Sequence, residues 1–496
     1  MLLGLLLKKA GITADLSEKE YNIDIKSITD DSRRIEKDSI FVAISGTKFD
    51  GHLFLSDVVE KGASVLVVER EIPRYPGVLL IKVEDTRIAL ANLAHSFYNF
   101  PAQNMICIAY TGTNGKTTGT YLVENILKKA FGEPIGRLGT IEYKLGDETI
   151  VAENTTPSPL LLARYFARMR EKDIRYVVIE VSSHGLEQRR ILGIPFKVGV
   201  FTNLTADHLD YHLNFNNYRE SKWRLFSEYI SRHSEGIAIF NLDDETGCEF
   251  SRRFKGKQLT FSLSKKADLN ARDWKFSPNK TEFKVVLSDR EVSIESSLVG
   301  LFNISNILGA FAVGLALDIP VEAIKEGVKA LKGVPGRFEP INAGQPFFVV
   351  VDYSHTPDAL KVTLENAKTF CKGRIIVVFG CGGNRDKTKR PLMGKVVGDA
   401  SEVEYAILTN DNPRTEDPAK IALMAEEGLK SSKIKKYDVI LDRREAIFNA
   451  IKYAKEGDLV LIAGKGHEDY QIVGETKFPF DDRIEARKSL EQLGWK

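Results

Sequence analysis

One glycine-containing loop constrains this chain more than any other segment. Residues 111–118 read Thr-Gly-Thr-Asn-Gly-Lys-Thr-Thr, directly after the apolar run 106–110 and before a helical pattern at 121–130. A strand that leads through such a loop into a helix N-terminus can hold phosphate, because glycine lets backbone N–H groups approach the oxygens. The spacing predicts that Lys116 reaches the β- and γ-phosphates and that the Thr117 hydroxyl binds Mg²⁺. We therefore expect a nucleoside triphosphate as ligand.

The loop is a shortened variant of the usual pattern. Tyr110 stands where that pattern has its first glycine. The alternative is a glycine-rich turn with a chance Lys-Thr pair, but the strand and the helix on either side favour the phosphate loop. The residues expected around the phosphates are Gly112, Thr113, Asn114, Gly115, Lys116, Thr117 and Thr118.

Length and composition limit the possible classes of protein. A chain of 496 residues exceeds a single core and suggests about three domains. The hydrophobic fraction of 43% and the charged fraction of 28% are typical of a globular protein. A net charge of +2 provides no general field for nucleic acid or anionic lipid, so anions must bind at local sites.

The N-terminus and the cysteines suggest a cytoplasmic protein. Residues 1–7 are apolar, but Lys8 and Lys9 follow them, whereas a secretory signal has its charge first and a longer apolar core. We expect the start of an amphipathic helix there, and no segment reaches transmembrane length. The four cysteines lack metal-ligand spacing, and two of them lie in strand-like runs. The expectation is a monomer without membrane insertion or nucleic-acid partner.

Strand and helix patterns alternate in three segments, predicted as domains 1–103, 104–336 and 337–496. The fold class is α/β. The predicted domains are a smaller N-terminal α/β domain, a central P-loop-type parallel sheet and a C-terminal Rossmann-like domain. The central strands, at 106–110, 176–181, 198–203 and 236–241, are nearly continuous in Val and Ile, as expected for parallel strands covered on both faces. Residues 259–299 alternate and predict an antiparallel edge. Open parallel sheets bind ligands at the carboxyl ends of their strands.

Chemically useful side chains follow two central strands. Glu180 and His184 end one strand, and His208 and His212 follow the next. Glu180 suits Mg²⁺, which prefers oxygen ligands, and His208 could bind the metal or a metal-bound water. The alternative for each histidine is loop capping and packing. Lys222 lies in a helical segment soon afterwards and is, from the residues alone, a surface lysine.

The last third of the chain carries a second group of candidates. Asn303 begins an alanine-rich helix, where it caps the helix or binds a base edge. Arg337 either clamps phosphate or pairs with Glu339, and Asp352 ends a strand. Arginines beside a carboxylate would suit an amino acid with more than one charged end. The charged residues of this kind at the predicted strand ends are Arg390, Arg414 and Glu468.

With these motifs assembled, the chain resembles the Mur ligase family over essentially its whole length. The resemblance rests on 111–117, on Glu-Val-Ser-Ser-His at 180–184, on Asp-His-Leu-Asp-Tyr-His at 207–212, on Gly-Arg-Phe-Glu at 336–339 and on Asp352. It implies an ATP-dependent amide ligase that works through an acyl phosphate in peptidoglycan precursor synthesis. The motifs are most similar to those of the member that extends UDP-N-acetylmuramoyl-L-alanyl-D-glutamate with meso-diaminopimelate.

The resemblance also implies roles for individual residues. Lys222 matches the family's lysine that CO₂ converts to a carbamate; a carbamate is an oxygen ligand for Mg²⁺ and forms from a neutral amine, which requires a depressed pKa. The implied metal ligands are Thr117, Glu180, His208 and the Lys222 carbamate, and the implied catalytic residues are Lys116, Glu180, His208 and Lys222. Further ATP contacts are implied for Asn303, Arg337 and Asp352. The UDP-muramoyl dipeptide would contact Ser32, Thr47, Asn154, Thr155, Thr156, Ser182, Gln188 and Arg190. Diaminopimelate would contact Arg390, Asp411, Asn412, Pro413, Arg414, Gly464 and Glu468.

Departures from the family pattern are few, and three alternatives stay open. Tyr110, Ala206 and Ser354 replace the residues usual at their positions, none of which has a chemical role. The first alternative is the lysine-adding version of the same ligase, which usually lacks Arg414. The second is a folylpolyglutamate-type ligase, which should lack Asn-Thr-Thr at 154–156 and the diaminopimelate residues. The third is a nucleotide-binding protein without catalysis.

Overall fold

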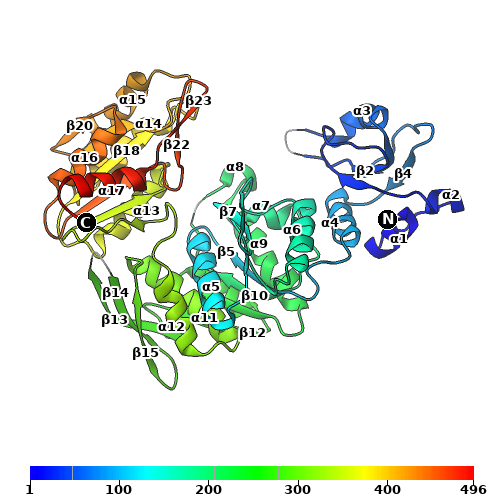
Figure 1. The fold of residues 1–496 in the computed structure, drawn as a ribbon, viewed down its shortest axis with the longest axis horizontal. Coiled ribbons are helices and arrows are strands. Elements are labelled where there is room, and N and C mark those ends of the chain that lie inside the picture. Colours follow the sequence, from blue (N-terminus) through cyan, green and yellow to red (C-terminus); the bar gives the residue numbers. More distant parts are fainter. Residues whose placement is uncertain (47–48, 206, 278–279) are drawn as a thin grey trace. The chain divides into compact units, whose positions relative to one another are not determined.

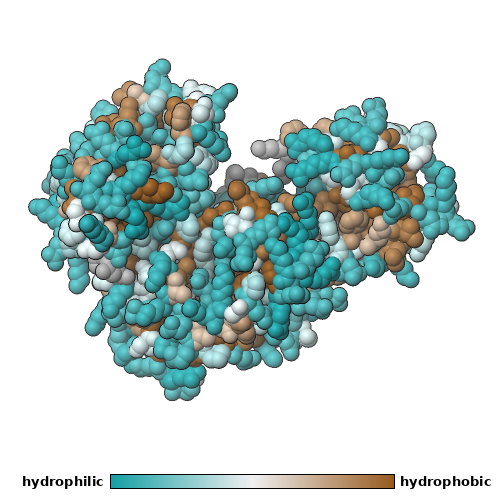
Figure 2. Space-filling model, in the orientation of Figure 1, coloured by the Kyte–Doolittle hydropathy of each residue, from teal (hydrophilic) through white to brown (hydrophobic). Residues whose placement is uncertain are grey.

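The computed structural model describes residues 1–46, 49–205, 207–277 and 280–496, and Thr47 and Ala206 therefore lie outside the described residues. The chain forms two compact units, one of residues 1–116 and 131–259, the other of residues 117–130 and 260–496. Hydrophilic residues cover most of the face shown in Figure 2. In the described part of the chain, no helix is both long and apolar enough to cross a membrane.

The first unit begins with a small parallel sheet of order β1-β2-β3-β4, coloured blue in Figure 1. Its strands are β1 (Ser27–Thr29), β2 (Ser39–Val42), β3 (Ala63–Val68) and β4 (Leu79–Lys82). Its helices are α1 (Leu3–Ala10), α2 (Glu18–Tyr21), η1 (Gly51–Phe54), α3 (Leu55–Glu60) and α4 (Thr86–Phe97). Ile40 and Val42 pack into one apolar cluster and Phe41 into another, so β2 is buried on both faces.

A second sheet of the first unit has the order β11-β10-β5-β9-β6-β7-β8. Its strands are β5 (Ile106–Thr111), β6 (Gly136–Leu138), β7 (Glu142–Leu145), β8 (Glu148–Val151), β9 (Tyr176–Glu180), β10 (Phe196–Phe201) and β11 (Ile237–Asn241). The strands from β11 to β6 are parallel, and β7 and β8 form an antiparallel hairpin. Tyr110 pairs with Glu180, and Thr111 pairs with Phe201, which brings three carboxyl ends side by side.

The helices of this part follow from local signals. They are α6 (Pro159–Glu171), α7 (Ser183–Glu187), α8 (Leu209–His212), α9 (Phe215–Arg224), η2 (Leu225–Tyr229), η3 (Ile230–Arg232) and α10 (Glu245–Arg253). Ser158 caps α6, with Pro159 at its first position, and Ser182 caps α7. Helix α6 and the strands β6–β8 were not predicted from the sequence.

The second unit opens with a helical and antiparallel part. Its elements are α5 (Lys116–Phe131), β12 (Lys257–Ser262), β13 (Leu269–Ser277), β14 (Lys280–Val286), β15 (Glu291–Ser296), α11 (Leu301–Ala316) and α12 (Val321–Ala330). Pairing of β14 with both β13 and β15 is antiparallel, as expected, whereas β12 pairs with β13 in parallel. Strand β14 alternates buried and exposed positions, as a sheet with one covered face should.

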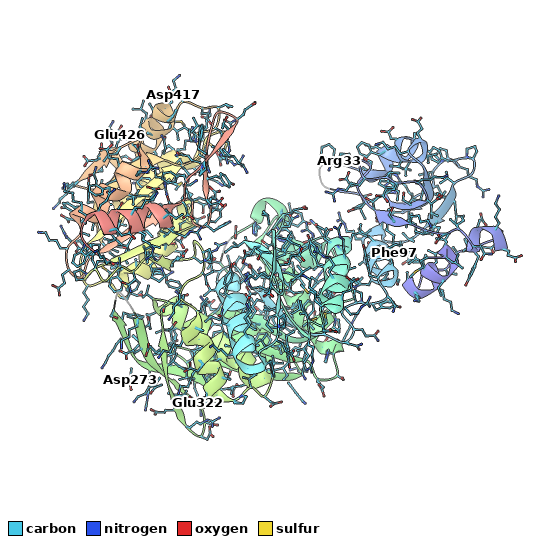
Figure 3. All side chains as sticks on the ribbon, in the orientation of Figure 1. Arg33, Phe97, Asp273, Glu322, Asp417 and Glu426 are labelled. Atoms are coloured by element: carbon cyan, nitrogen blue, oxygen red, sulfur yellow. The ribbon has the colours of Figure 1, made fainter. Side chains whose placement is uncertain are left out.

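The rest of the second unit is a six-stranded sheet of order β16-β17-β21-β18-β19-β20, parallel except at β16. Its strands are β16 (Glu339–Pro340), β17 (Phe348–Asp352), β18 (Ile375–Cys381), β19 (Val403–Asn410), β20 (Tyr437–Val439) and β21 (Leu459–Ala463), and β22 (Tyr470–Val473) and β23 (Thr476–Pro479) form a separate hairpin. Its helices are α13 (Pro357–Lys368), α14 (Lys389–Asp399), α15 (Pro418–Lys430), α16 (Arg443–Tyr453) and α17 (Asp482–Gln492). Asp417 caps α15, which also carries Glu426; both are labelled in Figure 3. Apolar clusters cover both faces of this sheet, so the predicted α/β class is confirmed.

Candidate functional site

The predicted phosphate loop has backbone conformations that favour its two glycines. Gly112 has φ +146°, and a Cβ there would lie 1.9 Å from Thr202 Oγ1. Gly115 also has positive φ, at 85°. Only a residue without a side chain fits at 112, because the loop runs directly against the end of β10. Figure 1 shows β5 and α5, the strand and helix that flank the loop.

Hydrogen bonds hold the loop to the residues after β10. The Thr113 amide donates to Asn203 O at 2.8 Å, and the Asn114 amide donates to Asn203 Oδ1 at 2.9 Å. Thr202 Oγ1 donates to Asn114 O at 2.6 Å. The loop shape is therefore fixed by the neighbouring strand end.

Lys116 folds over its own loop. Its Nζ donates to Gly112 O at 2.9 Å and to Thr113 O at 2.8 Å. Because α5 begins at this residue, the ammonium group and a helix N-terminus lie together, and both favour a bound anion. Thr117 and Thr118, in the first turn, are buried.

Lys222 is buried, with 1% of its surface exposed, so the expectation of a surface lysine was wrong. Its Nζ donates to Gly112 O at 2.9 Å and lies 4.7 Å from the centre of the Tyr218 ring. The hydroxyls of Tyr218 and Thr113 are 3.1 Å apart, which ties α9 to the phosphate loop. Burial, and then the positive charge of Lys116, lower the pKa of Lys222 well below its usual value.

Glu180 is fully buried beside the phosphate loop, at the end of β9. Its two carboxylate oxygens accept hydrogen bonds from the Thr140 amide and the Thr140 hydroxyl, each at 3.0 Å. A Cβ at Gly139 would lie 2.2 Å from Glu180 Oε1, so this approach requires glycine. The carboxylate is therefore held in one orientation.

The two histidines of the 208–212 segment differ. His212 is buried, with Nε2 2.9 Å from Ser183 Oγ, in agreement with the packing alternative. His208 is exposed, its Nε2 lies 3.5 Å from Asp207 Oδ2, and its ring centre is 4.9 Å from that of His184. Within the described ranges, no three His, Cys, Asp or Glu side chains form a metal-binding group. Mg²⁺ does not need a group of three such side chains, because it takes one or two carboxylates and completes its shell with water and phosphate.

A polar network joins the residues matched to the muramoyl dipeptide. Thr156 Oγ1 donates to Glu180 O at 2.9 Å and accepts from the Ser182 amide at 2.9 Å. Arg190 donates to Thr156 O at 2.7 Å and to Gln188 Oε1 at 2.8 Å. The Thr155 and Thr140 hydroxyls are 3.1 Å apart, and Tyr143 OH donates to Asn154 O at 2.6 Å. Of the dipeptide-matched residues that the structure describes, it thus brings together all except Ser32, and Thr47 lies outside the described residues.

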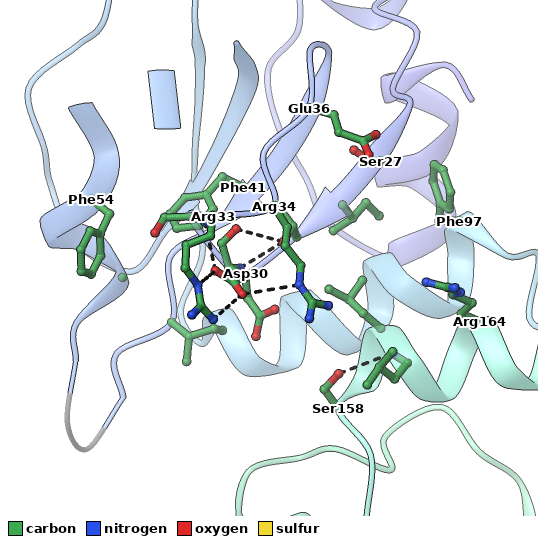
Figure 4. A pocket seen from close by; sticks show the side chains of 18 of the residues that line it. Ser27, Asp30, Arg33, Arg34, Glu36, Phe41, Phe54, Phe97, Ser158 and Arg164 are labelled. Atoms are coloured by element: carbon green, nitrogen blue, oxygen red, sulfur yellow. Dashed lines mark hydrogen bonds and ion pairs between the residues drawn. The ribbon is translucent and has the colours of Figure 1, made fainter. Parts of the chain in front are cut away.

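Ser32 lines a separate pocket of about 900 Å³ in the first unit (Figure 4). Arg33, Arg34 and Arg164 supply positive charge to this pocket, and Phe54 and Phe97 supply aromatic surface. Arg33 pairs with Asp31 at 2.8 Å. A pocket with cations and aromatic rings suits a nucleotide.

In the second unit, Arg337 and Asp352 lie close together, and Asn303 does not cap its helix. Asp352 Oδ2 accepts from the Phe338 amide at 2.8 Å, and Oδ1 accepts from the Ser354 amide and hydroxyl. Arg337 lies over the Tyr353 ring and, in the described part of the chain, makes no ion pair with Glu339, which accepts from the Gly336 amide instead. Gly300 is the N-cap of α11, and Asn303 Nδ2 donates to Val299 O, so the capping interpretation was wrong.

The seven residues matched to diaminopimelate lie around the ends of β19 and β21. Asn412 Nδ2 donates to Glu468 Oε2 at 2.8 Å, and Arg414 donates to Gly383 O at 2.8 Å. A Cβ at Gly464 would lie 2.7 Å from Asp411 Oδ2, and one at Gly383 would lie 1.8 Å from Pro413 O. Arg390 is buried and makes a two-pronged ion pair with Glu416, at 3.0 and 2.8 Å.

A buried ion pair ties the strands below this cluster to each other. Arg443 and Asp482 are joined by two hydrogen bonds of 2.7 Å, and both side chains have no exposed surface. The same guanidinium donates to Asn410 O and Ala463 O, at the ends of β19 and β21. The loops that carry Arg414 and Glu468 therefore start from one shared anchor.

Sequence reasoning missed several members of these sites. They are Thr140, Tyr143, Tyr218, Glu416, Arg443 and Lys465. All act through contacts distant in sequence or through burial, and neither leaves a local pattern. The glycines at 139 and 464 were the available signal, since a glycine beside a strand end marks a close approach.

The Arg390–Glu416 pair predicts a pH dependence of stability. The hydrogen bonds from Arg390 lower the pKa of Glu416 from 4.5 to about 2. Because the folded pKa is the lower one, the pair stabilises the fold above pH 4.5, and this contribution is lost as the pH falls from 4.5 towards 2. Urea unfolding midpoints measured across this range should fall less steeply for Glu416→Gln than for the wild type. Equal slopes would contradict the assignment.

Fold and site together define an α/β protein with a glycine-containing loop between a strand and a helix N-terminus, an arrangement that can hold phosphate. Sequence models match in three places: the Mur ligase family catalytic domain at residues 24–98, the Mur ligase middle domain at 110–314, and the Mur ligase glutamate ligase domain at 336–466.

Individual relatives agree with these matches. UDP-N-acetylmuramoyl-L-alanyl-D-glutamate–2,6-diaminopimelate ligase of Oceanobacillus iheyensis is 42% identical over 482 residues, covering 95% of this chain and 96% of its own. The protein of the same name from Geobacillus thermodenitrificans is 42% identical over 474 residues, with 95% and 96% covered. A solved structure with that name has a TM-score of 0.72 at 30% identity and covers both chains fully. Folylpolyglutamate synthase of Thermotoga maritima, 16% identical with a TM-score of 0.58 over 75% of this chain and 89% of its own, shares the fold alone. The chain belongs to the Mur ligase family.

Proposed function

We propose that the chain is an ATP-dependent ligase that joins meso-diaminopimelate to the D-glutamyl γ-carboxylate of UDP-N-acetylmuramoyl-L-alanyl-D-glutamate in peptidoglycan precursor synthesis. The observation that carries the proposal is that one chain, alike over its length to relatives of that name, holds both a phosphate-loop site and the Arg414–Asn412–Glu468 cluster. The folylpolyglutamate alternative is disfavoured because residues 154–156 and the diaminopimelate-matched residues are present. Thr156 bonds Glu180 O in the first unit, and Asn412 bonds Glu468 in the second.

The first chemical step is phosphoryl transfer. The γ-carboxylate of the dipeptide attacks the γ-phosphate of ATP, which gives an acyl phosphate and ADP. Lys116 and the N-terminal amides of α5 stabilise the charge on the transferred group. Mg²⁺, when bound, neutralises phosphate charge, and Thr117, Glu180, His208 and a carbamate on Lys222 would hold it. Asn303, Arg337 and Asp352 are proposed as further ATP contacts.

The second step forms the amide. The amine of diaminopimelate attacks the acyl carbon, and phosphate leaves from the tetrahedral intermediate. The chain contributes mainly by positioning the two reactants, since the activation comes from ATP. We propose that Thr156, Ser182, Gln188 and Arg190 hold the dipeptide, that the pocket at Ser32 takes the UDP end, and that three domains, 1–103, 104–336 and 337–496, divide these tasks.

Burial of Lys222 supports the proposed carbamate. A neutral amine adds to CO₂ to give a carbamate and one proton, and burial, which lowers the pKa of Lys222 well below its usual value, favours the neutral amine. The wild type incubated with ¹³C-bicarbonate should show a carbamate signal in the ¹³C spectrum, and Lys222→Arg should not, because a guanidinium remains charged. The same signal in both proteins would contradict the assignment.

Amino-acid choice is the sharpest test of the proposed function. Arg414→Ala should raise the KM for meso-diaminopimelate roughly tenfold to a hundredfold, because a desolvated Arg–carboxylate contact contributes a few kcal/mol. Turnover with L-lysine, which has no second carboxylate, should change much less. Phosphate release with each amino acid measures both values. A wild type that uses L-lysine as well as meso-diaminopimelate would favour the lysine-adding version, and an absence of amino-acid-dependent turnover would favour the non-catalytic alternative.

A further inference from the structure

Lys465 is a fully buried lysine within the amino-acid cluster. It lies two residues after the end of β21 and has no exposed surface. Its Nζ donates to Glu468 Oε2 at 3.1 Å and to Asn412 Oδ1 at 3.3 Å. Lysine is almost never fully buried unless it is paired, so this arrangement requires the two acceptors.

The backbone around Lys465 is built to turn its side chain inward. Gly464 has φ +119° and Gly466 has φ +55°, both in the region that favours glycine. A Cβ at Gly464 would meet Asp411 Oδ2 at 2.7 Å, and a Cβ at Gly466 would meet the Tyr353 side chain at 2.6 Å. Two tight positions on either side therefore fix the direction of the lysine.

Asn412 completes a triangle with Lys465 and Glu468. Its Nδ2 donates to Glu468 Oε2 at 2.8 Å, and its Oδ1 also accepts from the Ile472 amide at 2.9 Å. Two donors on Oδ1 fix the amide orientation, and two donors on Oε2 fix the carboxylate. No donor to Glu468 Oε1 occurs among the residues that the structure describes, so this oxygen remains for a ligand.

The charges of the triangle also favour ligand binding through Glu468. Lys465 Nζ lies 3.1 Å from Glu468 Oε2, on the buried side of the carboxylate. The lysine has no exposed surface with which to contact a substrate itself.

We propose that Lys465 is a positioning residue that holds Glu468, through its Oε2 and through Asn412, so that Glu468 Oε1 receives the ammonium group of the incoming amino acid. This proposal rests on the proposed function and adds the residue that sets its amino-acid affinity. It explains why the lysine is fully buried beside Glu468.

The test compares KM values for the three substrates in Lys465→Met, which keeps the side-chain length and removes the charge. The KM for meso-diaminopimelate should rise about tenfold or more, because the variant removes one partner of a buried charge pair. The KM values for ATP and for the UDP-muramoyl dipeptide should stay within about twofold of the wild type. Lys477→Met is the matched control, because Lys477 is an exposed lysine of the nearby β23 and should change none of the three. Equal losses for all three substrates would overturn the proposal, and so would tighter binding of the amino acid.

A double-mutant cycle separates positioning from a general structural role. Glu468→Gln alone should raise the same KM, and Lys465→Met in that background should add less than about twofold, because residues that act through one contact are not additive. Additive effects would overturn the proposal. If Lys465→Met does not fold, Lys465→Gln, which keeps a hydrogen-bond donor, replaces it in the same double-mutant cycle with Glu468→Gln. A wild type without amino-acid-dependent ADP formation would reject the proposed function and this inference together, whereas a normal wild type with a uniform loss in the variant would reject the inference alone.

Discussion

Lys116→Ala should lower ATP turnover roughly a hundredfold to a thousandfold, which is the effect of removing one preorganised group that stabilises transition-state charge. The expected effect is large because Lys116 Nζ donates hydrogen bonds to the carbonyl oxygens of Gly112 and Thr113, in the loop where the phosphates are expected. ADP release with saturating dipeptide and amino acid measures the effect on kcat.

Lys129→Ala is the control for this variant. Lys129 is an exposed lysine of the same helix and should keep turnover within about twofold of the wild type, as an exposed charge contributes little. Activity of Lys116→Ala within a few-fold of the wild type would show that the loop does not bind the reacting phosphates.

The second large effect concerns stability. Asp482→Asn leaves the Arg443 guanidinium buried without a counter-charge, and breaking such a pair costs about 3–5 kcal/mol. The urea midpoint of the transition that includes residues 337–496 should fall accordingly. KM for the amino acid should rise as well, because Arg443 joins the ends of β19 and β21.

Asp399→Asn provides the matched comparison. Asp399 pairs with Lys395 one helical turn away on α14, and both side chains are well exposed. Loss of an exposed pair of this kind costs about 0.3–0.5 kcal/mol. Similar midpoints for the two variants would mean that the Arg443–Asp482 pair does not anchor the sheet.

Much of the fold and of the phosphate loop could be predicted because the signals are local. Runs of Val and Ile marked β5, β9, β10 and β11 within one or two residues, and Gly112 and Gly115 marked the loop. The hairpin β7–β8 was missed because its short strands mix charged and apolar residues. The burial of Lys222 was missed because its contact with Gly112 spans 110 residues of sequence. Such contacts arise from the tertiary fold, and no spacing rule contains them.

The hydrogen bonds from the Thr113 and Asn114 amides to Asn203 have a consequence for ligand binding. A receptor whose recognition loop already has its final backbone shape loses little conformational entropy when the ligand arrives. We therefore expect hydrogen exchange at these two amides to be slow before any nucleotide is added and to change little afterwards, so that the affinity for ATP is not reduced by the ordering of this loop.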